Sequence, residues 1–354
     1  MPNHSRRSPD YQPELRKNIV TREWVIIAKG RGRRPSDLVR QNDGAENLPA
    51  HDPDCPFCPG GEANTPPEVF ALRDGTVKDG PGWKVRVVPN KFAALRLAGS
   101  DQSHHEGIYI SRDGFGAHEV IIETPEHNLD LWEMEESRVA EVLEAFRQRY
   151  IVYESTETLP YVLIFRNHGP QAGTSLAHPH SQLIASPVMP QQVQVEMQGA
   201  AAYWEYLGRC VFCAMIQQEA RHGERVVLDT EHFLVITAFA GKHPFETWIL
   251  PKRHTIRFAD ISEEEVADLA HVLPVTLGKI AACLHHPSYN FVIHTAPAAE
   301  HNTRAYHWHL EIFPRFTTLG GFELGSAIYI NIADPEDAAG YLRESEGGVG
   351  VKAV

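Results

Sequence analysis

The sequence predicts an α+β protein of two similar units, each an antiparallel sheet with one long helix, which arose by internal duplication. Runs rich in β-branched residues, such as YVLIF and HFLVITAF, are typical of strands. Each half also contains a long amphipathic segment, as expected for a helix that packs on a sheet. The same motifs occur in the same order in both halves, which indicates a repeat. We place the units at residues 1–195 and 196–354.

Three motifs define this repeat. Cys55-x-x-Cys58 precedes EVIIETPEH and then His-Pro-His at 178–180, whereas Cys210-x-x-Cys213 precedes ETWILPKRH and then His-Trp-His at 307–309. In both halves a glutamate lies eight residues before the histidine that ends the middle motif. From that histidine to the His-x-His motif there are 51 residues in one half and 53 in the other. Such matched spacing favours duplication over coincidence.

The predicted helices follow the middle motifs. Ser262 and Glu265 form a capping-box pattern at the start of the second helix. The segment after Met189-Pro190, up to residue 208, is polar and Gln-rich, and is either a linker or a helix. Both helices carry an apolar stripe at helical spacing, formed by Val139, Val142, Leu143, Phe146 and Tyr150 in the first and by Val266, Leu269, Leu273, Leu277 and Ile280 in the second.

Composition narrows the class of partner. The net charge of −13 disfavours nonspecific nucleic-acid binding, which needs Lys and Arg to neutralise phosphates. No apolar run approaches the roughly 18 residues that a membrane span requires. The start MPNHSRRSPDYQ lacks the apolar stretch of a signal peptide, so we expect a cytoplasmic protein without nucleic-acid or membrane partners.

The paired cysteines predict metal sites. In a reducing compartment, Cys-x-x-Cys pairs more often bind metal than form disulfides, and a structural zinc ion takes four Cys or His ligands. The repeat supplies two closed sets, so we expect about two structural zinc ions per chain. His118, His168 and His243 stay open as alternative ligands, and two pairs of plain core thiols are the simpler alternative. The predicted sets are Cys55, Cys58, His127 and His178, and Cys210, Cys213, His254 and His307.

The second histidine of each His-x-His motif remains free if the first one binds metal. His180 is followed two residues later by Gln182, whereas His309 is followed by Glu311. A neutral imidazole is a good nucleophile towards phosphorus. Gln182 donates a hydrogen bond to a phosphoryl oxygen but is not a general acid, which favours a long-lived phosphoryl-histidine intermediate.

Six segments of the chain carry a family resemblance: ELRKNIVTREWVIIAKGRGRRPSD, CPFC, VVPNKFAAL, NHGPQAGTSLAHPHSQ, AYHWHLEIFPR and GGFELGSAIYIN. The resemblance is to the galactose-1-phosphate uridylyltransferase family of the histidine triad superfamily, and it extends over nearly the whole chain. It implies two histidine-triad-like units and ping-pong uridylyl transfer from a UDP-hexose to a hexose 1-phosphate through His180. It also implies a homodimer that shares its sites across subunits.

The resemblance assigns further residues to the substrate. It implies that arginines and a glycine-bearing loop meet the phosphates, that Asn90 meets the nucleoside, and that the GGFELGSAIYIN segment meets the acceptor. Lys91 and Tyr329 depart from the family pattern, since an acid and a glutamine are usual there. The second Cys-x-x-Cys suggests zinc where that family often binds iron. The implied substrate residues are Arg31, Arg34, Asn90, Asn167, Gly173, Ser175, Gln182, Gly321, Glu323 and Tyr329.

Three alternatives stay open. The paired Cys-x-x-Cys motifs and GFELGSAIYIN resemble the ADP-glucose phosphorylase branch, which adenylylates the same histidine. A non-catalytic zinc-containing nucleotide-binding protein would keep the fold and the metals, but the intact His180-Ser181-Gln182 run speaks against it. A nucleotidyl hydrolase would usually carry a further histidine where Gln182 stands.

Overall fold

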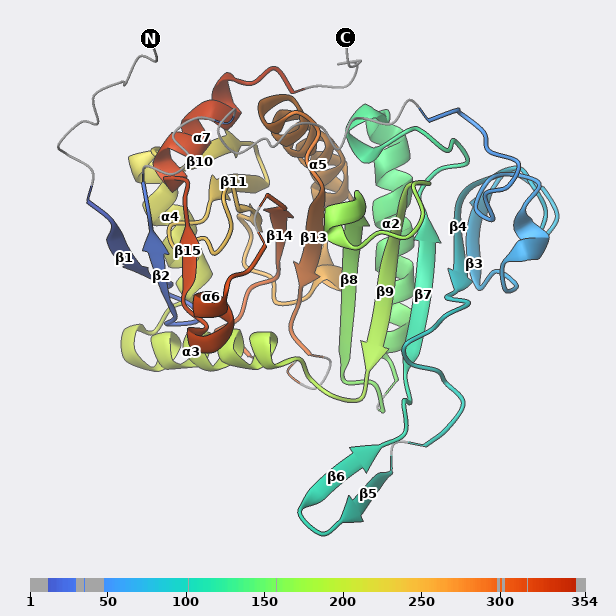
Figure 1. Ribbon diagram of the computed structural model, residues 1–354, viewed down its shortest axis with the longest axis horizontal. Helices are drawn as coiled ribbons and strands as arrows, with labels where there is room; N and C mark the ends of the chain where they lie inside the picture. The colour runs from blue at the N-terminus through green and yellow to red at the C-terminus, as the bar shows by residue number, and fades with distance from the viewer. Residues whose placement is uncertain are drawn as a thin grey trace.

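The computed structural model describes residues 12–29, 35, 48–100, 102–156, 158–297, 300, 303–316 and 318–347. One large sheet, built from strands of both halves of the chain, lies at its centre (Figure 1). The first half of the chain contributes β3 (Phe70–Arg73), β4 (Trp83–Pro89), β7 (Ala117–Ile122), β8 (Tyr161–His168) and β9 (His180–Ser186). The second half contributes β10 (Val226–Asp229), β11 (Phe233–Thr237), β12 (Thr247–Pro251), β13 (Tyr289–His294) and β14 (His309–Pro314).

The strand order exposes the duplication. From one edge to the other it is β10-β11-β12-β14-β13-β8-β9-β7-β4-β3, a 10-stranded sheet. Read outward from the β13–β8 seam, each half presents its fourth, fifth, third, second and first strand, and the two halves meet antiparallel. The helices α2 (Glu136–Glu154) and α5 (Glu263–Leu284) occupy equivalent places, before β8 and β13. The predicted α+β class with two similar units is therefore confirmed.

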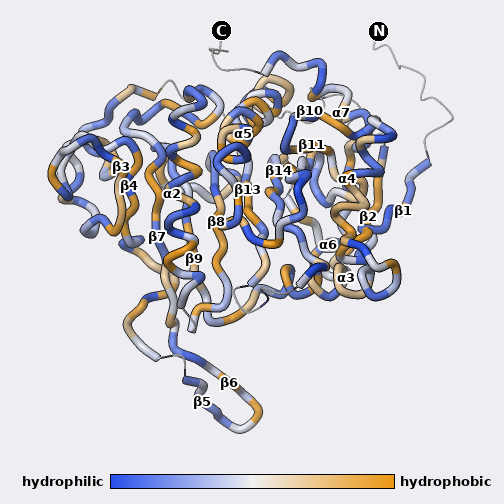
Figure 2. The backbone as a smooth tube through the Cα atoms, turned by 180° about the vertical axis from the view of Figure 1, so that it is seen from behind, coloured by the Kyte–Doolittle hydropathy of each residue, from blue (hydrophilic) through white to orange (hydrophobic). Residues whose placement is uncertain are grey.

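Both long helices pack on the same face of the sheet, which Figure 2 shows from behind. All five predicted apolar residues of α2 are buried, and so are those of α5 except the partly buried Val266. The predicted capping box at Ser262 and Glu265 is present at the start of α5. Among the described residues, α5 is the one helix long and apolar enough to cross a membrane, but 61% of that window is buried inside the protein, as in a core helix.

Among the described residues, helices cover the opposite face in the second half only. There α3 (Gln191–Leu207) and α4 (Val211–His222) pack on β11 and β12 through Phe212, Leu234 and Trp248. The stretch that the sequence left as linker or helix is thus helix α3. A small sheet of β1 (Glu14–Lys17), β2 (Trp24–Ile27) and β15 (Tyr329–Asn331) lies beside them, and it brings the first predicted unit into contact with the second. The boundary between the units stays a prediction.

The remaining elements lie around this frame. The hairpin of β5 (Ser103–Glu106) and β6 (Tyr109–Arg112) projects from the body (Figure 1). The helix α7 (Pro335–Glu344) packs beside α5, and α6 (Gly321–Ser326) precedes β15. Short 3-10 turns are η1 (Glu62–Asn64), η2 (Leu131–Glu133), η3 (Pro170–Ala172) and η4 (Phe258–Asp260).

In the first half, the loop with Cys55, Phe57 and Cys58 buries Val120 and Ile122 of β7 on this face. The same face is less covered over β8 and β9. Side chains there alternate along each strand, so every second residue of β8 and β9 points away from α2. On this face the side chains of Phe165, Asn167, Gln182 and Ile184 are only half-buried. The residues between them along the two strands point to the other face and are buried there. We call this surface, formed by β7, β9, β8 and β13, the open face.

A buried ion-pair network ties the seam together beneath that face. Arg166, which is 1% exposed, donates to Glu123 at 3.0 Å and pairs with Asp130 at 2.8 Å. Its guanidinium also donates to the Tyr289 hydroxyl on β13, and Ser181 of β9 donates to Glu123 at 2.6 Å. One cation thus joins strands from both halves.

We expect Arg166→Leu to lower the free energy of unfolding by roughly 3–5 kcal/mol, because it leaves the buried Glu123 without its cation and leaves Asp130 with His168 alone. Urea unfolding of metal-loaded protein measures this. The control is Lys84→Met, which breaks a half-exposed pair with Glu141 and should cost less than about 1 kcal/mol. Equal losses for both variants would contradict the role given to the network.

Candidate active site

The structure brings the first predicted ligand set together. Cys55 Sγ lies 3.7 Å from His178 Nδ1, and Cys58 Sγ lies 3.5 Å from both His127 Nδ1 and His178 Nδ1. All four side chains are buried, and their ligand atoms lie within 4.8 Å of one another. A buried cluster of two thiols and two imidazoles is typical of structural zinc.

The second set has the same construction. Cys213 Sγ lies 3.3 Å from His254 Nδ1 and 3.6 Å from His307 Nδ1, and Cys210 completes the cluster. Zinc–sulfur and zinc–nitrogen bonds of usual length give tetrahedron edges of about 3.6 Å between sulfur and nitrogen. Both sets fit a four-coordinate ion, and neither leaves a position for substrate.

Hydrogen bonds prepare the imidazoles for metal. His178 Nε2 donates to the carbonyl oxygen of Thr124 at 2.8 Å, and His307 Nε2 donates to that of Pro251 at 2.8 Å. Each ring therefore keeps its proton on Nε2 and turns the Nδ1 lone pair towards the thiols. Burial lowers the pKa of His178 to about 4, so this ring is neutral as a ligand must be.

The three alternative histidines lie outside both clusters. His168 Nδ1 pairs with Asp130 at 2.8 Å on the helix side of the sheet. His243 packs between the rings of Phe313 and Tyr329. The third, His118, contacts Gln182 on the open face.

His180 is held as a nucleophile. Its Nδ1 donates to the carbonyl oxygen of His178 at 2.8 Å, which leaves the lone pair on Nε2. Phe57 contacts the ring edge to face, with 5.4 Å between ring centroids. Burial, together with the positive charge of Arg166, lowers the pKa of His180, so the imidazole is neutral at neutral pH. A neutral ring with a fixed tautomer is able to attack phosphorus through Nε2.

The counterpart His309 has the same backbone hydrogen bond but no access to solvent. Its Nδ1 donates to His307 O at 3.0 Å, yet the ring is 0% exposed and stacks on Trp248 at 5.2 Å. It belongs to a third buried cluster with Glu196, His294 and Glu311. Although burial opposes it, Glu196 and Glu311 raise the pKa of His294 to about 9. The second histidine of the motif is thus 7% exposed in one half and fully enclosed in the other.

Gln182 is oriented by its neighbours. His118 Nδ1 accepts from the amide of Ala94 at 3.1 Å, so the ring proton is on Nε2 and donates to Gln182 Oε1 at 2.7 Å. Asn90 Nδ2 donates to the same oxygen at 3.5 Å. Because the amide oxygen accepts these hydrogen bonds, the Gln182 nitrogen is the end presented on the open face. Gln182 lies two residues after His180 in β9, so both side chains point to the same face.

The other predicted substrate residues fall into three groups. Asn90 lies beside Gln182, and Asn167 is the second-last residue of β8, on the open face. Gly173, at φ +85°, and Ser175 lie on the exposed loop between β8 and β9. Figure 1 shows α6, with Gly321 and Glu323, set apart from β9 beyond β13 and β8. Tyr329 lies in β15 against His243, and Arg31 and Arg34 fall outside the described residues.

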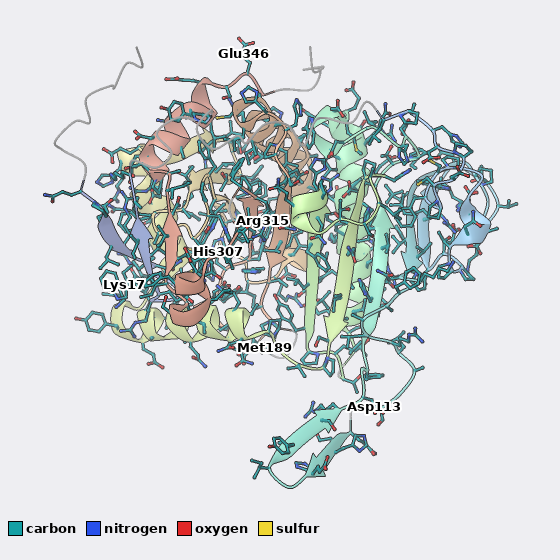
Figure 3. All side chains as sticks on the ribbon, viewed as in Figure 1. Lys17, Asp113, Met189, His307, Arg315 and Glu346 are labelled. Carbon is teal, nitrogen blue, oxygen red and sulfur yellow. The ribbon has the colours of Figure 1, made fainter. Side chains whose placement is uncertain are left out.

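Sequence reasoning missed several polar residues that the fold brings to these sites. His118 appeared only as a spare ligand, although β7 pairs directly with β9 and this brings His118 within hydrogen-bond distance of Gln182. Asn290 and Arg315 of the second half were not predicted, yet Asn290 donates to Asn167 and Arg315 donates to Asn290. Figure 3 labels Arg315 close to the seam. Glu196, in the segment left open as linker or helix, joins the third cluster.

Comparison with known proteins gives consistent matches. The ADP-glucose phosphorylase of Arabidopsis thaliana is 37% identical over 336 residues, which cover 94% of this chain and 93% of that protein. The galactose-1-phosphate uridylyltransferase of Thermotoga maritima is 28% identical, with coverage of 94% and 98%. A crystal structure of the Arabidopsis phosphorylase with bound ADP-glucose has a TM-score of 0.80 at 34% identity, and covers 95% of this chain and 99% of that one.

Two family descriptions match nearly the whole chain. The N-terminal domain of galactose-1-phosphate uridyl transferase matches residues 3–190, and the C-terminal domain matches residues 196–335. These matches agree with the predicted class of enzyme, a nucleotidyltransferase. The chain belongs to the galactose-1-phosphate uridyl transferase family.

Proposed function

We propose that this chain moves a nucleoside monophosphate from a nucleoside diphosphate hexose to a phosphate acceptor through a nucleotidyl-His180 intermediate. One observation carries the proposal. His180 has its Nδ1 proton fixed on a backbone carbonyl, and the amide nitrogen of Gln182 is presented on the same face of the same strand. This pairs a nucleophile with a donor for a phosphoryl oxygen.

In the first half reaction, His180 Nε2 attacks the α-phosphorus and forms the P–N bond. The bond from phosphorus to the bridging oxygen breaks, and hexose 1-phosphate leaves with the electron pair. The ring becomes cationic, and the carbonyl oxygen of His178, 2.8 Å from Nδ1, stabilises that charge. Gln182 donates to a non-bridging oxygen on which charge accumulates.

In the second half reaction, an oxygen of the acceptor phosphate attacks the same phosphorus. The P–N bond breaks, and the electron pair returns to Nε2 of His180. Gln182 has no proton of acidic pKa to give, so a water molecule is not activated by it. The intermediate therefore survives until the acceptor binds.

Two donors are candidates. Uridylyl transfer from a UDP-hexose to galactose 1-phosphate, the function predicted first, is supported by the family description and by relatives such as that of Thermotoga maritima. Adenylyl transfer from ADP-glucose to inorganic phosphate is supported by the higher identity to the Arabidopsis enzyme, 37% over 94% of the chain. Lys91 and Tyr329, which depart from the uridylyltransferase pattern, favour the second candidate.

The metal ions in this proposal are structural. Two zinc ions per chain, one in each Cys2His2 cluster, would hold the loops that carry His178 and His307. We also propose a homodimer in the cytoplasm, in which the exposed α6 of one subunit meets the site of its partner. The family resemblance supports that sharing.

Metal content tests the clusters. Purified protein should contain about two zinc ions per chain by elemental analysis, and Cys210→Ser should lose one ion and keep the other, since the two clusters share no ligand. Protein that folds with no transition metal at all would contradict the assignment of both clusters.

The nucleophile is tested by His180→Ala. We expect transfer to fall by roughly 10³-fold or more, because no other imidazole of the described residues has its Nδ1 proton fixed in this way and an Nε2 lone pair on the open face. Zinc content and the thermal unfolding midpoint should stay close to those of the wild type. His309→Ala is the counterpart in the repeat, and its transfer activity should fall far less. Wild-type activity in His180→Ala would rule out the mechanism.

The intermediate identifies the donor. Incubating the protein with UDP-glucose or with ADP-glucose, without acceptor, should add the mass of UMP or AMP to the peptide that contains His180. The adduct should be stable in base and labile in acid, as phosphorus bonded to imidazole is. Whichever adduct forms faster names the donor, and no adduct from either sugar nucleotide would exclude both candidates.

A further inference from the structure

A chain of hydrogen bonds crosses the seam on the open face. Arg315 Nε donates to Asn290 Oδ1 at 2.5 Å. Asn290 Nδ2 donates to Asn167 Oδ1 at 2.8 Å and to the carbonyl oxygen of Ala172 at 2.9 Å. Because the oxygen of Asn290 faces a cation, its nitrogen must face Asn167. The oxygen of Asn167 is then engaged, and its nitrogen is left to donate elsewhere.

The strand register places these hydrogen-bonded residues in line with His180. Asn290 pairs with Asn167 across the seam, and Phe313 pairs with Asn290 on the other side. The pair Arg166 and Ser181 puts the next residues, Asn167 and His180, opposite each other. With strands about 4.8 Å apart, Asn290 lies roughly 10 Å from His180 along the open face. That is the scale on which a diphosphate and its substituent extend from an α-phosphorus at His180.

Arg315 carries a charge that the described residues do not balance. It is half-buried, and burial lowers its pKa. No carboxylate of the described residues lies within ion-pair distance of it, and the nearby Glu246 already accepts from Lys242 N, His243 N and Trp248 Nε1. Other buried guanidinium groups do have a carboxylate partner, namely those of Arg16, Arg86, Arg149, Arg166 and Arg225.

The surroundings of Arg315 also suit an anion. His243, on the neighbouring turn, is kept neutral because burial and the charges of Arg315 and Lys242 lower its pKa to about 4. Lys242 itself pairs with Glu23 at 2.8 Å. The Nε of Arg315 is engaged by Asn290, which leaves the two terminal nitrogens as a fork of the kind that binds phosphate oxygens.

We propose that Arg315 binds the phosphate group that leaves in the first half reaction and attacks in the second. The inference rests on the proposed function and names its acceptor site: a phosphate dianion, either inorganic or carried by a hexose. One site serves both steps, because the leaving and attacking phosphates occupy the same side of the α-phosphorus. Asn290 connects Arg315 to Asn167 and to Ala172, in the segment that follows β8, by hydrogen bonds.

The role of Arg315 is tested by forming the nucleotidyl-enzyme first and then adding an acceptor. Nucleotidyl-enzyme of the wild type and of Arg315→Gln is isolated and mixed with inorganic phosphate, with galactose 1-phosphate, or with buffer alone, and loss of the adduct is followed in time. For Arg315→Gln we expect the acceptor concentration that gives a half-maximal rate to rise roughly 10- to 100-fold, because one or two charge-assisted hydrogen bonds are lost. The rate in buffer alone should not change. The arm that discharges the wild type names the phosphate source.

Two further variants keep the outcome clear. Arg315→Lys retains the charge and should recover part of the acceptor affinity, and it substitutes for Arg315→Gln if that protein does not fold. Arg209→Gln removes an exposed arginine between α3 and α4 and should behave as wild type. An unchanged acceptor dependence in the Arg315 variants, or an equal slowing in all three arms, overturns the inference. A wild type that forms no adduct would instead overturn the proposed function.

Discussion

The hydrogen bond from His180 Nδ1 to the carbonyl oxygen of His178 is the contact on which the site depends. It fixes the tautomer, so Nε2 alone is nucleophilic, and it places the stabilising dipole where positive charge develops. That carbonyl belongs to a residue whose own side chain is held by Cys55, Cys58 and Thr124. Metal bound at the cluster would therefore set the position of the nucleophile without touching the substrate.

The duplication explains why a second histidine of identical local geometry is not a second site. His309 repeats the backbone hydrogen bond, and its cluster repeats the thiols. What differs is the face of the sheet above it. In the second half α3 and α4 cover that face, and Glu196 of α3 enters the cluster around His309. In the first half no helix of the described residues covers β8 and β9 on that face, and His180 keeps an exposed fraction of 7% where His309 has none.

Local pattern allowed much of this to be predicted. The repeat spacing identified both ligand sets, and apolar periodicity identified α2 and α5, because each of these signals lies within one motif or one helix. The contacts of Gln182 with His118 and of Asn167 with Asn290 could not be predicted. They depend on strand register across the sheet and on the antiparallel meeting of the two halves, and neither is encoded in a local stretch. The same holds for β2, which pairs with β15 from the far end of the chain.

The two amides on the open face are oriented by the same device. Gln182 has its oxygen engaged by a histidine whose proton position is set by the amide of Ala94, and Asn167 has its oxygen engaged by an asparagine that Arg315 has turned. Each relay converts an ambiguous carboxamide into a fixed donor on the face where phosphate would lie. Donors fixed before the substrate arrives need no reorganisation as charge moves during transfer, which is the condition for strong electrostatic stabilisation. In the proposed reaction, the open face would therefore act through oriented dipoles around His180, together with the Arg315 cation, which has no carboxylate partner among the described residues.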